Sequence, residues 1–483
     1  MKTTTDLLPH QTLAVAKMLP TRIGALFMDM GLGKSRTTLE LARIRQEKWD
    51  RLFWFCPVSL KETIYQEILK HTDLTTTDIA LWGETVADDR LPLAARVHII
   101  GIESMSASNR IVLAYAAIVT ERSFVVVDES SYIKGHDSLR TQRITELSAN
   151  ARYRLILTGT PFSNGVADLY AQMAFLSKKI LDYASFYSFA ANHLEYEMRR
   201  DRFGVLRQTN HVIRAHNVEY LAAKIAPYVY QVRKGECLDL PEKLYETRYV
   251  SMTNEQRCAY EQAKEEILSL ELEDWTSIAI FRLFTALQAI VCGFWTRTDP
   301  ATHQTQRLTF SHRRLDALQS VLDEIPDGEK IIIWAKYHHA IAEIRTALQH
   351  RDGPDALAEF HGTIPQHQRY QELQRWQQGS ARYLLATQST GGHGLTLNEA
   401  AYAIFYADGY KYSERVQAED RQHRIGQTRQ PIYISLCCAS SIDERIHHAL
   451  ARKESALRSF QQQVQRYRNE GMKERARTLI HEL

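Results

Sequence analysis

The sequence predicts an α/β protein with two lobes, each built on a parallel sheet. The chain has 483 residues, more than one typical domain, and its 44% of hydrophobic residues suffices for two buried cores. Short apolar runs alternate with amphipathic helical stretches in both halves, which is the pattern of βαβ units. Several of these runs end in polar motifs. We therefore expect a first lobe at 1–235 and a second lobe at 236–483.

Helical segments are expected to interrupt both lobes. The first lobe is predicted to carry a mostly helical, aromatic-rich protrusion at about 175–232. The second lobe is predicted to carry a helical insertion at about 254–305, whose polar part at 296–306 reads as a loop, and a helical tail at about 452–483. The apolar runs that predict the second parallel sheet are 331–334, 383–385 and 403–406.

The string M-D-M-G-L-G-K-S at 28–35 lies between an apolar run and a helical stretch. This strand–loop–helix context is typical of a phosphate-binding loop, in which glycines let the backbone approach the phosphate closely. Lys34 would place a cation on the β- and γ-phosphates, and Ser35 would offer a hydroxyl to Mg²⁺. The complete motif has glycine where this chain has Met28. A glycine turn capped by a helix N-terminus is therefore the alternative interpretation of the isolated loop.

Two further apolar runs end in polar motifs. The run at 124–127 is followed by Asp128 and Glu129, which predicts a buried strand that delivers two carboxylates at its end. Asp128 is placed to hold Mg²⁺ through water, and Glu129 to orient or deprotonate an attacking water. The run at 153–157 leads directly into T-G-T-P at 158–161. An acidic pair is also a common helix N-cap, but three such motifs in this order favour a nucleotide site.

A string near the C-terminus, V-Q-A-E-D-R-Q-H-R-I-G-Q-T-R at 416–429, contains two closely spaced arginines. Arg421 and Arg424 are three residues apart, so on a helix they would share one face and could both point across a cleft between the lobes. An inserted arginine can supply about 10³- to 10⁵-fold in the rate of phosphoryl transfer, because it neutralises developing charge. The alternative is a pair of surface arginines on an exposed helix.

Taken together, these motifs resemble the Swi/Snf-related branch of the superfamily-two helicase-like ATPases, in order along almost the whole chain. The H-R-I-G-Q pattern separates this branch from strand-separating relatives. The matching strings are L-L-P-H-Q (7–11), M-G-L-G-K-S (30–35), C-P-V-S-L (56–60), D-E-S-S (128–131), L-T-G-T-P (157–161), L-P-E-K (240–243), I-I-I-W-A-K (331–336), T-G-G-H-G-L-T-L (390–397), the arginine string and S-I-D-E-R-I (441–446).

The resemblance implies a fold and an activity. The expected fold is two RecA-like parallel-sheet lobes with helical insertions, the P-loop NTPase core of helicase superfamily 2. The expected activity is that of a DNA-dependent ATPase, which uses ATP and Mg²⁺ to move along double-stranded or branched DNA and to remodel DNA or protein–DNA complexes. Two alternatives stay open: a strand-separating DNA or RNA helicase, and an ATP-gated DNA-binding module whose hydrolysis is uncoupled from movement.

The resemblance also assigns roles residue by residue. The residues expected to be catalytic are Lys34, Asp128, Glu129, Arg421 and Arg424. Those expected to bind the nucleotide are Gln11, which would read the adenine, Met30, Gly31, Leu32, Gly33, Lys34, Ser35 and Gly394. Those expected to hold Mg²⁺ are Ser35 and Asp128. Those expected to couple hydrolysis to movement are Thr158, Thr160 and Gln417. Those expected to contact DNA phosphates are Ser59, Ser104, Gly362, Thr363, Ser389 and Thr390.

One departure from the family pattern concerns coupling. Family members usually have a small residue and then His after the Asp-Glu pair, whereas this chain has Ser130 and Ser131. A hydrogen bond from that His to the Thr158 and Thr160 motif must therefore be made differently or not at all. Hydrolysis itself depends on Asp128 and Glu129, which are both present.

Composition limits which partners and which cellular compartment the sequence predicts. A net charge of +3 is nearly balanced, so a nucleic-acid surface must be local, with the basic stretches at 197–202 and 452–483 as candidates or as ordinary solvated faces. No apolar stretch reaches the length of a membrane span. The six cysteines are scattered without C-x-x-C, which predicts neither zinc nor disulfides but a reducing cytoplasm. By resemblance, we expect a monomer of compact bacterial or phage type, nucleoid-associated, with partners in replication, repair, recombination or defence.

Overall fold

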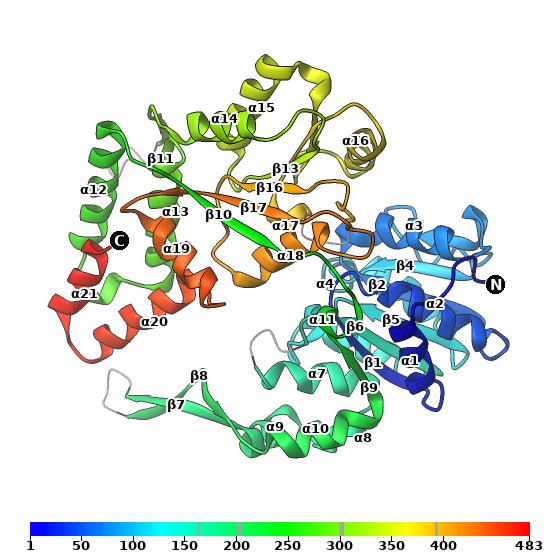
Figure 1. Ribbon diagram of the computed structural model, residues 1–483. Coiled ribbons are helices and arrows are strands. Elements are labelled where there is room, and N and C mark those ends of the chain that lie inside the picture. Colours follow the sequence, from blue (N-terminus) through cyan, green and yellow to red (C-terminus); the bar gives the residue numbers. More distant parts are fainter. Residues whose placement is uncertain (162–164, 201–204, 299–303, 392–394) are drawn as a thin grey trace. The chain divides into compact units, whose positions relative to one another are not determined.

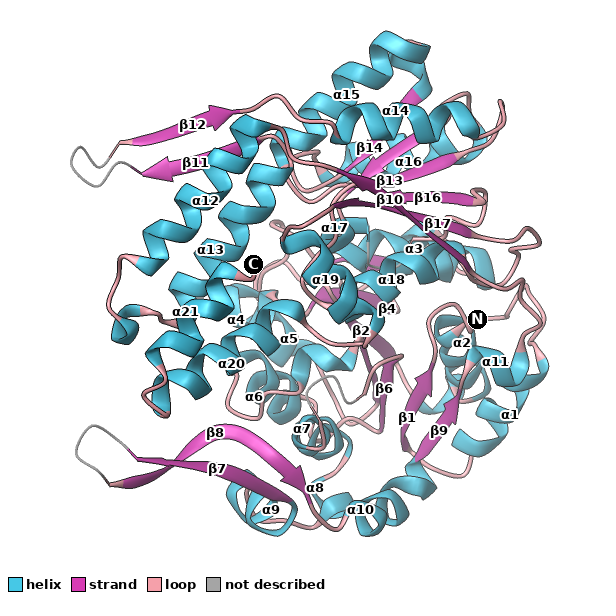
Figure 2. Cartoon of the chain, turned by 60° about the vertical axis from the view of Figure 1, so that its left-hand side comes forward, coloured by secondary structure: helices cyan, strands magenta, loops and turns pink. Residues whose placement is uncertain are grey.

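A computed structural model of the chain describes residues 1–161, 165–200, 205–298, 304–391 and 395–483 (Figures 1 and 2). The chain divides into two compact units, Met1–Asp239 and Leu240–Leu483. Each unit contains its own large sheet, in which the paired strands run parallel. No helix among the described residues is long and apolar enough to cross a membrane.

Seven described strands form the sheet of the first unit, in the order β3-β4-β2-β5-β6-β1-β9. Their apolar residues are almost all buried, as expected for a parallel sheet covered on both faces. The strands are β1 Ile23–Met28, β2 Arg51–Cys56, β3 Ile79–Leu81, β4 Val97–Gly101, β5 Ser123–Asp128, β6 Tyr153–Thr158 and β9 Val229–Val232. Because β5, β6 and β1 are neighbours, the three sequence motifs that follow them lie at one edge of the sheet.

Helices cover both faces of this first sheet. Alternation along a strand separates the two cores: in β2, Trp54 packs with one helical layer, while Phe53 and Phe55 pack with the other. The first layer consists of α1 Pro9–Met18, α2 Lys34–Ile44 and α3 Lys61–His71. The second layer consists of α4 Ser104–Ala107, α5 Asn109–Ile118, α6 Leu139–Leu147 and α7 Ala167–Leu176.

The segment at 175–232, predicted to be mostly helical, also contains strands. Within the described residues, an antiparallel hairpin pairs Leu194 with Ala215 and Tyr196 with Val212. Tyr196 and Val212 pack against the core of the unit, so alternation of period two applies here rather than helical periodicity. The elements of this segment are α8 Lys178–Leu181, α9 Phe186–His193, β7 Leu194–Arg200, β8 Leu206–Ala215 and α10 Val218–Ile225, and α11 Lys234–Cys237 follows after β9.

The sheet of the second unit has six described strands, in the order β10-β17-β16-β13-β15-β14. Helices α14 and α15 pack on one face, and α16 and α18 on the other. The strands are β10 Leu244–Val250, β13 Ile331–Trp334, β14 Leu357–Phe360, β15 Tyr383–Ala386, β16 Tyr402–Phe405 and β17 Ile432–Cys438. The helices are α14 Arg314–Glu324, α15 His338–Asp352, α16 Gln366–Gln378, the short α17 Gln388–Gly391 and α18 Tyr412–Gln422.

A separate helical cluster, visible in Figure 2, completes the second unit and has its own apolar core. It joins the insertion to the C-terminal tail through α12 Asn254–Leu268, α13 Ser277–Val291, α19 Ile442–Ala451, α20 Ala456–Asn469 and α21 Lys473–His481. The prediction of a loop at 296–306 was wrong for the described part, where β11 Phe294–Thr298 pairs with β12 Thr305–Thr309. Alternating Thr and Arg residues suit a two-stranded ribbon even though few of them are apolar.

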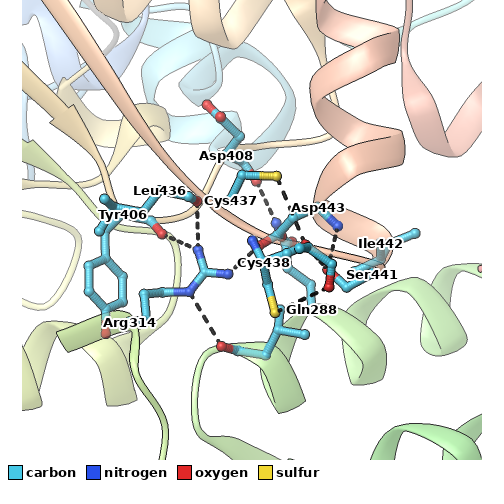
Figure 3. A network of polar contacts seen from close by, with 12 residues as sticks. Gln288, Arg314, Tyr406, Asp408, Leu436, Cys437, Cys438, Ser441, Ile442 and Asp443 are labelled. Atoms are coloured by element: carbon cyan, nitrogen blue, oxygen red, sulfur yellow. Dashed lines mark hydrogen bonds and ion pairs between the residues drawn. The ribbon is translucent and has the colours of Figure 1, made fainter. Parts of the chain in front are cut away.

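Buried Arg314 ties the strand ends of the second unit to its helical cluster (Figure 3). Its side chain is 0% exposed and its Nη1 donates to the carbonyls of Tyr406, at 2.6 Å, and Leu436, at 2.9 Å. Its Nη2 forms an ion pair with Asp443, which also accepts from the backbone N–H of Cys438 at 3.1 Å. Burial alone would lower the pKa of Arg314, but the charge of Asp443 raises it above its ordinary value.

Candidate functional site

The loop between β1 and α2 has the backbone of a phosphate cradle. Gly31 and Gly33 have φ values of 83° and 77°, which residues with a Cβ adopt rarely. Nζ of Lys34 donates to the Met28 carbonyl at 2.9 Å, within the same loop. The loop runs into the first turn of α2, where backbone N–H groups and the helix dipole attract an anion. Ser35, half-buried, is the second residue of that helix.

Gln11 and His10 support this loop from α1. Gln11 is 4% exposed; its Nε2 donates to the Leu32 carbonyl at 3.1 Å and its Oε1 accepts from the Leu8 N–H at 3.0 Å. A ring nitrogen of His10 lies 2.9 Å from the same Leu32 carbonyl. Met30 and Leu32 are buried and anchor the loop to the core. In this structure Gln11 therefore fixes the loop backbone, a contact for which the sequence offers no signal.

Asp128 is the last residue of β5 and Glu129 follows it; they are 6% and 7% exposed. Burial and the neighbouring Glu129 raise the pKa of Asp128 to about 6, against the positive charge of Lys34, which lowers it. Glu129 has φ 49° and ψ 56°, the left-handed region, and its N–H donates to Asp128 Oδ1 at 2.9 Å. Two neighbouring carboxyl groups close to a lysine form a suitable place for a divalent cation that also binds phosphate.

The T-G-T-P segment after β6 lies against the phosphate-binding loop. A Cβ on Gly159 would be 3.4 Å from the Met28 carbonyl oxygen and from the Met30 nitrogen, so the two backbones are in close contact. The Thr160 N–H donates to Thr158 Oγ1 at 3.0 Å. Within the first unit, the fold thus brings Thr158 and Thr160, two of the residues expected to couple hydrolysis to movement, next to the phosphate-binding loop.

The two phosphate-contact candidates of the first unit also lie close together. Ser59 is exposed in the turn after β2, and Ser104 begins α4 after the neighbouring strand β4. Glu103 joins them, because its Oε2 accepts from the N–H of Val58 at 3.0 Å. Since β2 is adjacent to β5, these residues extend the edge of the sheet that carries the nucleotide residues.

The four candidates of the second unit are also neighbours. Gly362 and Thr363 follow β14, while Ser389 and Thr390 lie in α17 after the adjacent strand β15. A Cβ on Gly362 would be 3.9 Å from Thr390 Oγ1. Gly362, Thr363 and Ser389 are exposed, and Thr390 is partly so.

A partly buried chain of polar groups orients Thr363. Its Oγ1 is 2.8 Å from Nδ1 of His361, whose Nε2 is 2.8 Å from Oε2 of Glu359. Arg345 donates to both oxygens of Glu359 at 2.7 Å. Burial would raise the pKa of Glu359, but His361 and Arg345 lower it to about 2. Sequence reasoning missed Arg345, Glu359 and His361, because nothing in their spacing marks them.

The arginine string differs from the prediction. Helix α18 ends at Gln422, so Arg421 lies in its last turn while Arg424 lies beyond it, and the two do not share a helical face. Arg421 is 3% exposed. Nη1 of Arg424 donates to the Leu395 carbonyl at 2.7 Å and to Thr396 Oγ1 at 2.9 Å. Gln417 is half-buried on α18, and Gly394 lies outside the described residues.

An ion network that the sequence did not reveal holds α18 in place. Arg415 bonds Asp408 Oδ1 and Glu419 Oε1, both at 2.8 Å, and its guanidinium lies 3.4 Å from the ring centroid of Phe405. Glu419 also pairs with Lys243 of the L-P-E-K string at 2.9 Å. These contacts fix the helix that ends next to both arginines of the string.

Two RecA-like lobes, the first with a phosphate-binding loop and paired carboxylates at the same edge of its sheet, define a P-loop NTPase with a helicase superfamily 2 core. The SNF2-related domain model matches residues 13–293 of the chain, and the helicase conserved C-terminal domain model matches residues 313–426. The chain therefore belongs to the SNF2-related family. This confirms the family and the fold class expected from the sequence.

Several known proteins are similar to the chain. The TATA-binding protein-associated factor BTAF1 of Arabidopsis thaliana is 26% identical over 88% of this chain and 23% of its own length. The DNA annealing helicase and endonuclease ZRANB3 of Mus musculus is 24% identical over 94% of this chain and 40% of its own length. The solved structure of the Sulfolobus solfataricus SWI2/SNF2 ATPase core in complex with dsDNA is 23% identical in sequence. The match covers 93% of this chain and 92% of the solved chain, with a TM-score of 0.42. The chain thus spans less than half the length of either curated relative.

Proposed function

We propose that this chain is a DNA-dependent ATPase that hydrolyses ATP to move along double-stranded or branched DNA and to remodel DNA or protein–DNA complexes. The observation that carries the proposal is the shared edge of β5, β6 and β1, where the phosphate cradle, two buried carboxylates and the T-G-T-P segment meet. Membership of the SNF2-related family supports it, and the name of the ZRANB3 relative describes a protein that acts on DNA.

The residues at this edge fit ATP and Mg²⁺. Gly31 and Gly33 have the φ values that a close backbone approach to phosphate needs, and a Cβ on Gly33 would collide with Nε2 of Gln11. Within the described residues, no group of three or more His, Cys, Asp or Glu could hold a metal ion. Asp128 at the end of β5 and Ser35 in the first turn of α2 are the oxygen donors that would hold Mg²⁺ together with phosphate oxygens. The ion, when bound, neutralises charge on the transferring phosphoryl group.

Each catalytic side chain then has a defined task. Lys34 would exchange the Met28 carbonyl for the β- and γ-phosphates, and Glu129 would orient the attacking water and accept its proton. We propose that Arg421 and Arg424 act as arginine fingers on the γ-phosphoryl group, and that Thr158, Thr160 and Gln417 couple hydrolysis to movement. Phosphoryl transfer demands little covalent chemistry from the protein, so positioning and charge decide the rate.

DNA would be held by phosphate contacts without sequence preference. In the first unit Ser59 and Ser104, and in the second unit the exposed group around Thr363, offer hydroxyl and backbone N–H donors. Alternate binding of DNA by the two groups would advance the protein along one strand without separating the duplex.

All six cysteines are free, which suits a protein that works in the reducing cytoplasm.

The test is steady-state ATP hydrolysis by the wild type, Lys34→Ala and a control, Lys48→Ala, whose lysine is exposed away from the loop. Each is assayed alone and with single-stranded DNA, duplex DNA, branched DNA and RNA. We expect duplex or branched DNA to stimulate the wild type and Lys48→Ala, and Lys34→Ala to be inactive. Hydrolysis indifferent to every nucleic acid would contradict the proposal and favour the uncoupled binding module.

A second assay separates movement from strand separation. Displacement of a triplex-forming strand from duplex DNA, with no unwinding of a tailed duplex, is the expected result for a translocase. Unwinding of the tailed duplex, or stimulation by RNA alone, would instead favour the strand-separating helicase.

A further inference from the structure

Gln172 of α7 connects the loops that follow two neighbouring strands of the first unit. The hydroxyl of Ser130, after β5, donates to Oε1 of Gln172 at 2.6 Å. Nε2 of Gln172 donates to the carbonyl of Pro161, after β6, at 3.0 Å, and to the carbonyl of Asp168 in its own helix at 2.8 Å. Both Ser130 and Gln172 are 0% exposed. The side chain therefore joins two loops in an environment from which water is excluded.

The turn that Gln172 holds contains an unfavourable backbone conformation. Glu129 is in the left-handed region, at φ 49° and ψ 56°, which a residue with a Cβ adopts only when its surroundings hold it there. Ser130 is the next residue, and its buried hydroxyl is anchored on Gln172. Anchoring Ser130 thus restrains the direction in which the Glu129 side chain leaves the turn.

The other end of the connection reaches the segment packed on the phosphate-binding loop. Pro161 ends the T-G-T-P string, in which Gly159 contacts the backbone of Met28 and Met30. A displacement of this segment would therefore be transmitted through Gln172 to the turn that carries Glu129. Ser131 stands where the family resemblance predicts a histidine, so the connection runs through Ser130 instead.

We infer that Gln172 is a positioning residue for hydrolysis: it holds the Asp128–Glu129 turn in register with the T-G-T-P segment and transmits movement between them. The inference rests on the proposed ATPase function. Gln172 contacts neither nucleotide phosphate nor the attacking water in this role. It acts by keeping the Glu129 carboxylate where a water next to the γ-phosphate must be oriented, and small misplacements of such a group reduce turnover strongly.

A purely structural role is the competing explanation, and the chain offers a matched control for it. Gln256 in α12 is 2% exposed, and its Nε2 donates to the Ile290 carbonyl at 2.7 Å while its Oε1 accepts from the Thr253 N–H at 3.0 Å. It is thus another buried glutamine that ties its helix to a second backbone segment. It belongs to the helical cluster of the second unit, on an element that carries none of the residues expected to bind nucleotide.

The experiment compares Ser130→Ala, Gln172→Leu, the double variant and Gln256→Leu with the wild type. The quantities measured are kcat and KM for DNA-stimulated ATP hydrolysis, affinity for a fluorescent ATP analogue, and unfolding in urea. We expect Ser130→Ala and Gln172→Leu each to lower kcat by about tenfold to a hundredfold, with KM and analogue affinity changed less than about twofold. The double variant should be no slower than the slower single variant, because both changes break one connection. Gln256→Leu should lose stability but keep kcat.

Other results would refute either the positioning role of Gln172 or the proposed ATPase function. Wild-type kcat in Ser130→Ala and Gln172→Leu, or a fall in kcat that Gln256→Leu reproduces at equal loss of stability, would refute the positioning role. If Gln172→Leu does not fold, Ser130→Ala, which removes a single oxygen atom, decides by the same criterion. A wild type that shows no DNA-stimulated hydrolysis would refute the proposed function itself, and the inference with it.

Discussion

Gly33 and Gln11 are packed so closely that a Cβ on the glycine would collide with Nε2 of the glutamine. The same Nε2 donates to the carbonyl of Leu32, next to Gly33 in the loop. The glycine is therefore needed twice, once for its φ of 77° and once for the space that Gln11 occupies. The phosphate-binding loop is shaped by α1 as well as by its own sequence.

Gly33→Ala should weaken nucleotide binding and lower stability. We expect a loss of about 1–2 kcal/mol in the free energy of unfolding from backbone strain, and at least about tenfold weaker binding of a fluorescent ATP analogue. Gly328→Ala is the control, because Gly328 has a φ of 83° with no atom within 4 Å of an added Cβ. Gly328→Ala should lose stability but keep the wild-type affinity for the ATP analogue. Equal analogue affinity in both variants would show that the collision with Gln11 is unimportant.

Arg424→Ala should impair turnover far more than nucleotide binding. We expect kcat to fall by at least about a hundredfold, because an arginine finger acts mainly in the transition state, with analogue affinity within about threefold of wild type. Arg429 of the same string is the control, since its side chain is 44% exposed and pairs with Glu329. Turnover in Arg424→Ala equal to that of Arg429→Ala would rule out the finger role.

Thr363→Glu should weaken DNA binding. A carboxylate among donors that face a phosphate introduces repulsion, so we expect about tenfold weaker binding of duplex DNA at low salt and a smaller difference at high salt. Thr346→Glu, on an exposed position of α15, provides the control for the added charge. Fluorescence anisotropy over a salt series measures both. Identical salt profiles for the two variants would argue against phosphate contacts at Thr363.

The stability that Glu359 contributes should depend on pH. Its folded pKa of about 2 lies below the ordinary value of 4.5, so the contribution is present above pH 4.5 and is lost as pH falls towards 2. The side chain of Glu359 is 17% exposed, and the difference between its folded and ordinary pKa corresponds to at most about 3 kcal/mol of folding stability. Glu359→Gln should therefore be less stable than wild type in urea at pH 7, with the gap closing near pH 2. A gap independent of pH would contradict this assignment.

Asp443→Ala should destabilise the second unit by about 3–5 kcal/mol, because it leaves the buried charge of Arg314 without its counter-ion. Glu324→Ala is the control, because it breaks an exposed ion pair. The side chain of Arg248 is 37% exposed and that of Glu324 is 50% exposed, so the loss should be less than about 1 kcal/mol. Urea unfolding measures both. Similar losses in the two variants would mean that Arg314 finds other partners or water.

Local patterns were enough to predict the two parallel sheets and the strand ends at which the phosphate-binding loop, the acidic pair and the T-G-T-P segment lie. The phosphate-binding loop needs glycines at fixed positions before a helix, and buried strands need apolar runs, so each is written in a few consecutive residues. The order of the strands in the sheet, which the sequence did not predict, places the strand ends at Asp128 and Thr158 next to each other. Two predictions were less accurate where strands carry few apolar residues: the segment with the hairpin β7–β8 was expected to be mostly helical, and part of the hairpin β11–β12 was expected to be a loop.

Only the tertiary structure decided how the functional side chains are supported. Gln172 meets Ser130, and Arg415 meets Asp408 and Glu419, because separate strands and helices bring their elements together. The end of α18 at Gln422, which separates Arg421 from Arg424, likewise depends on contacts of the following turn with residues 395–400. The sequence by itself therefore determined which groups can do the chemistry, since that depends on residue type and local backbone. Their orientation depends on buried hydrogen bonds between distant residues, which only the folded chain brings within reach.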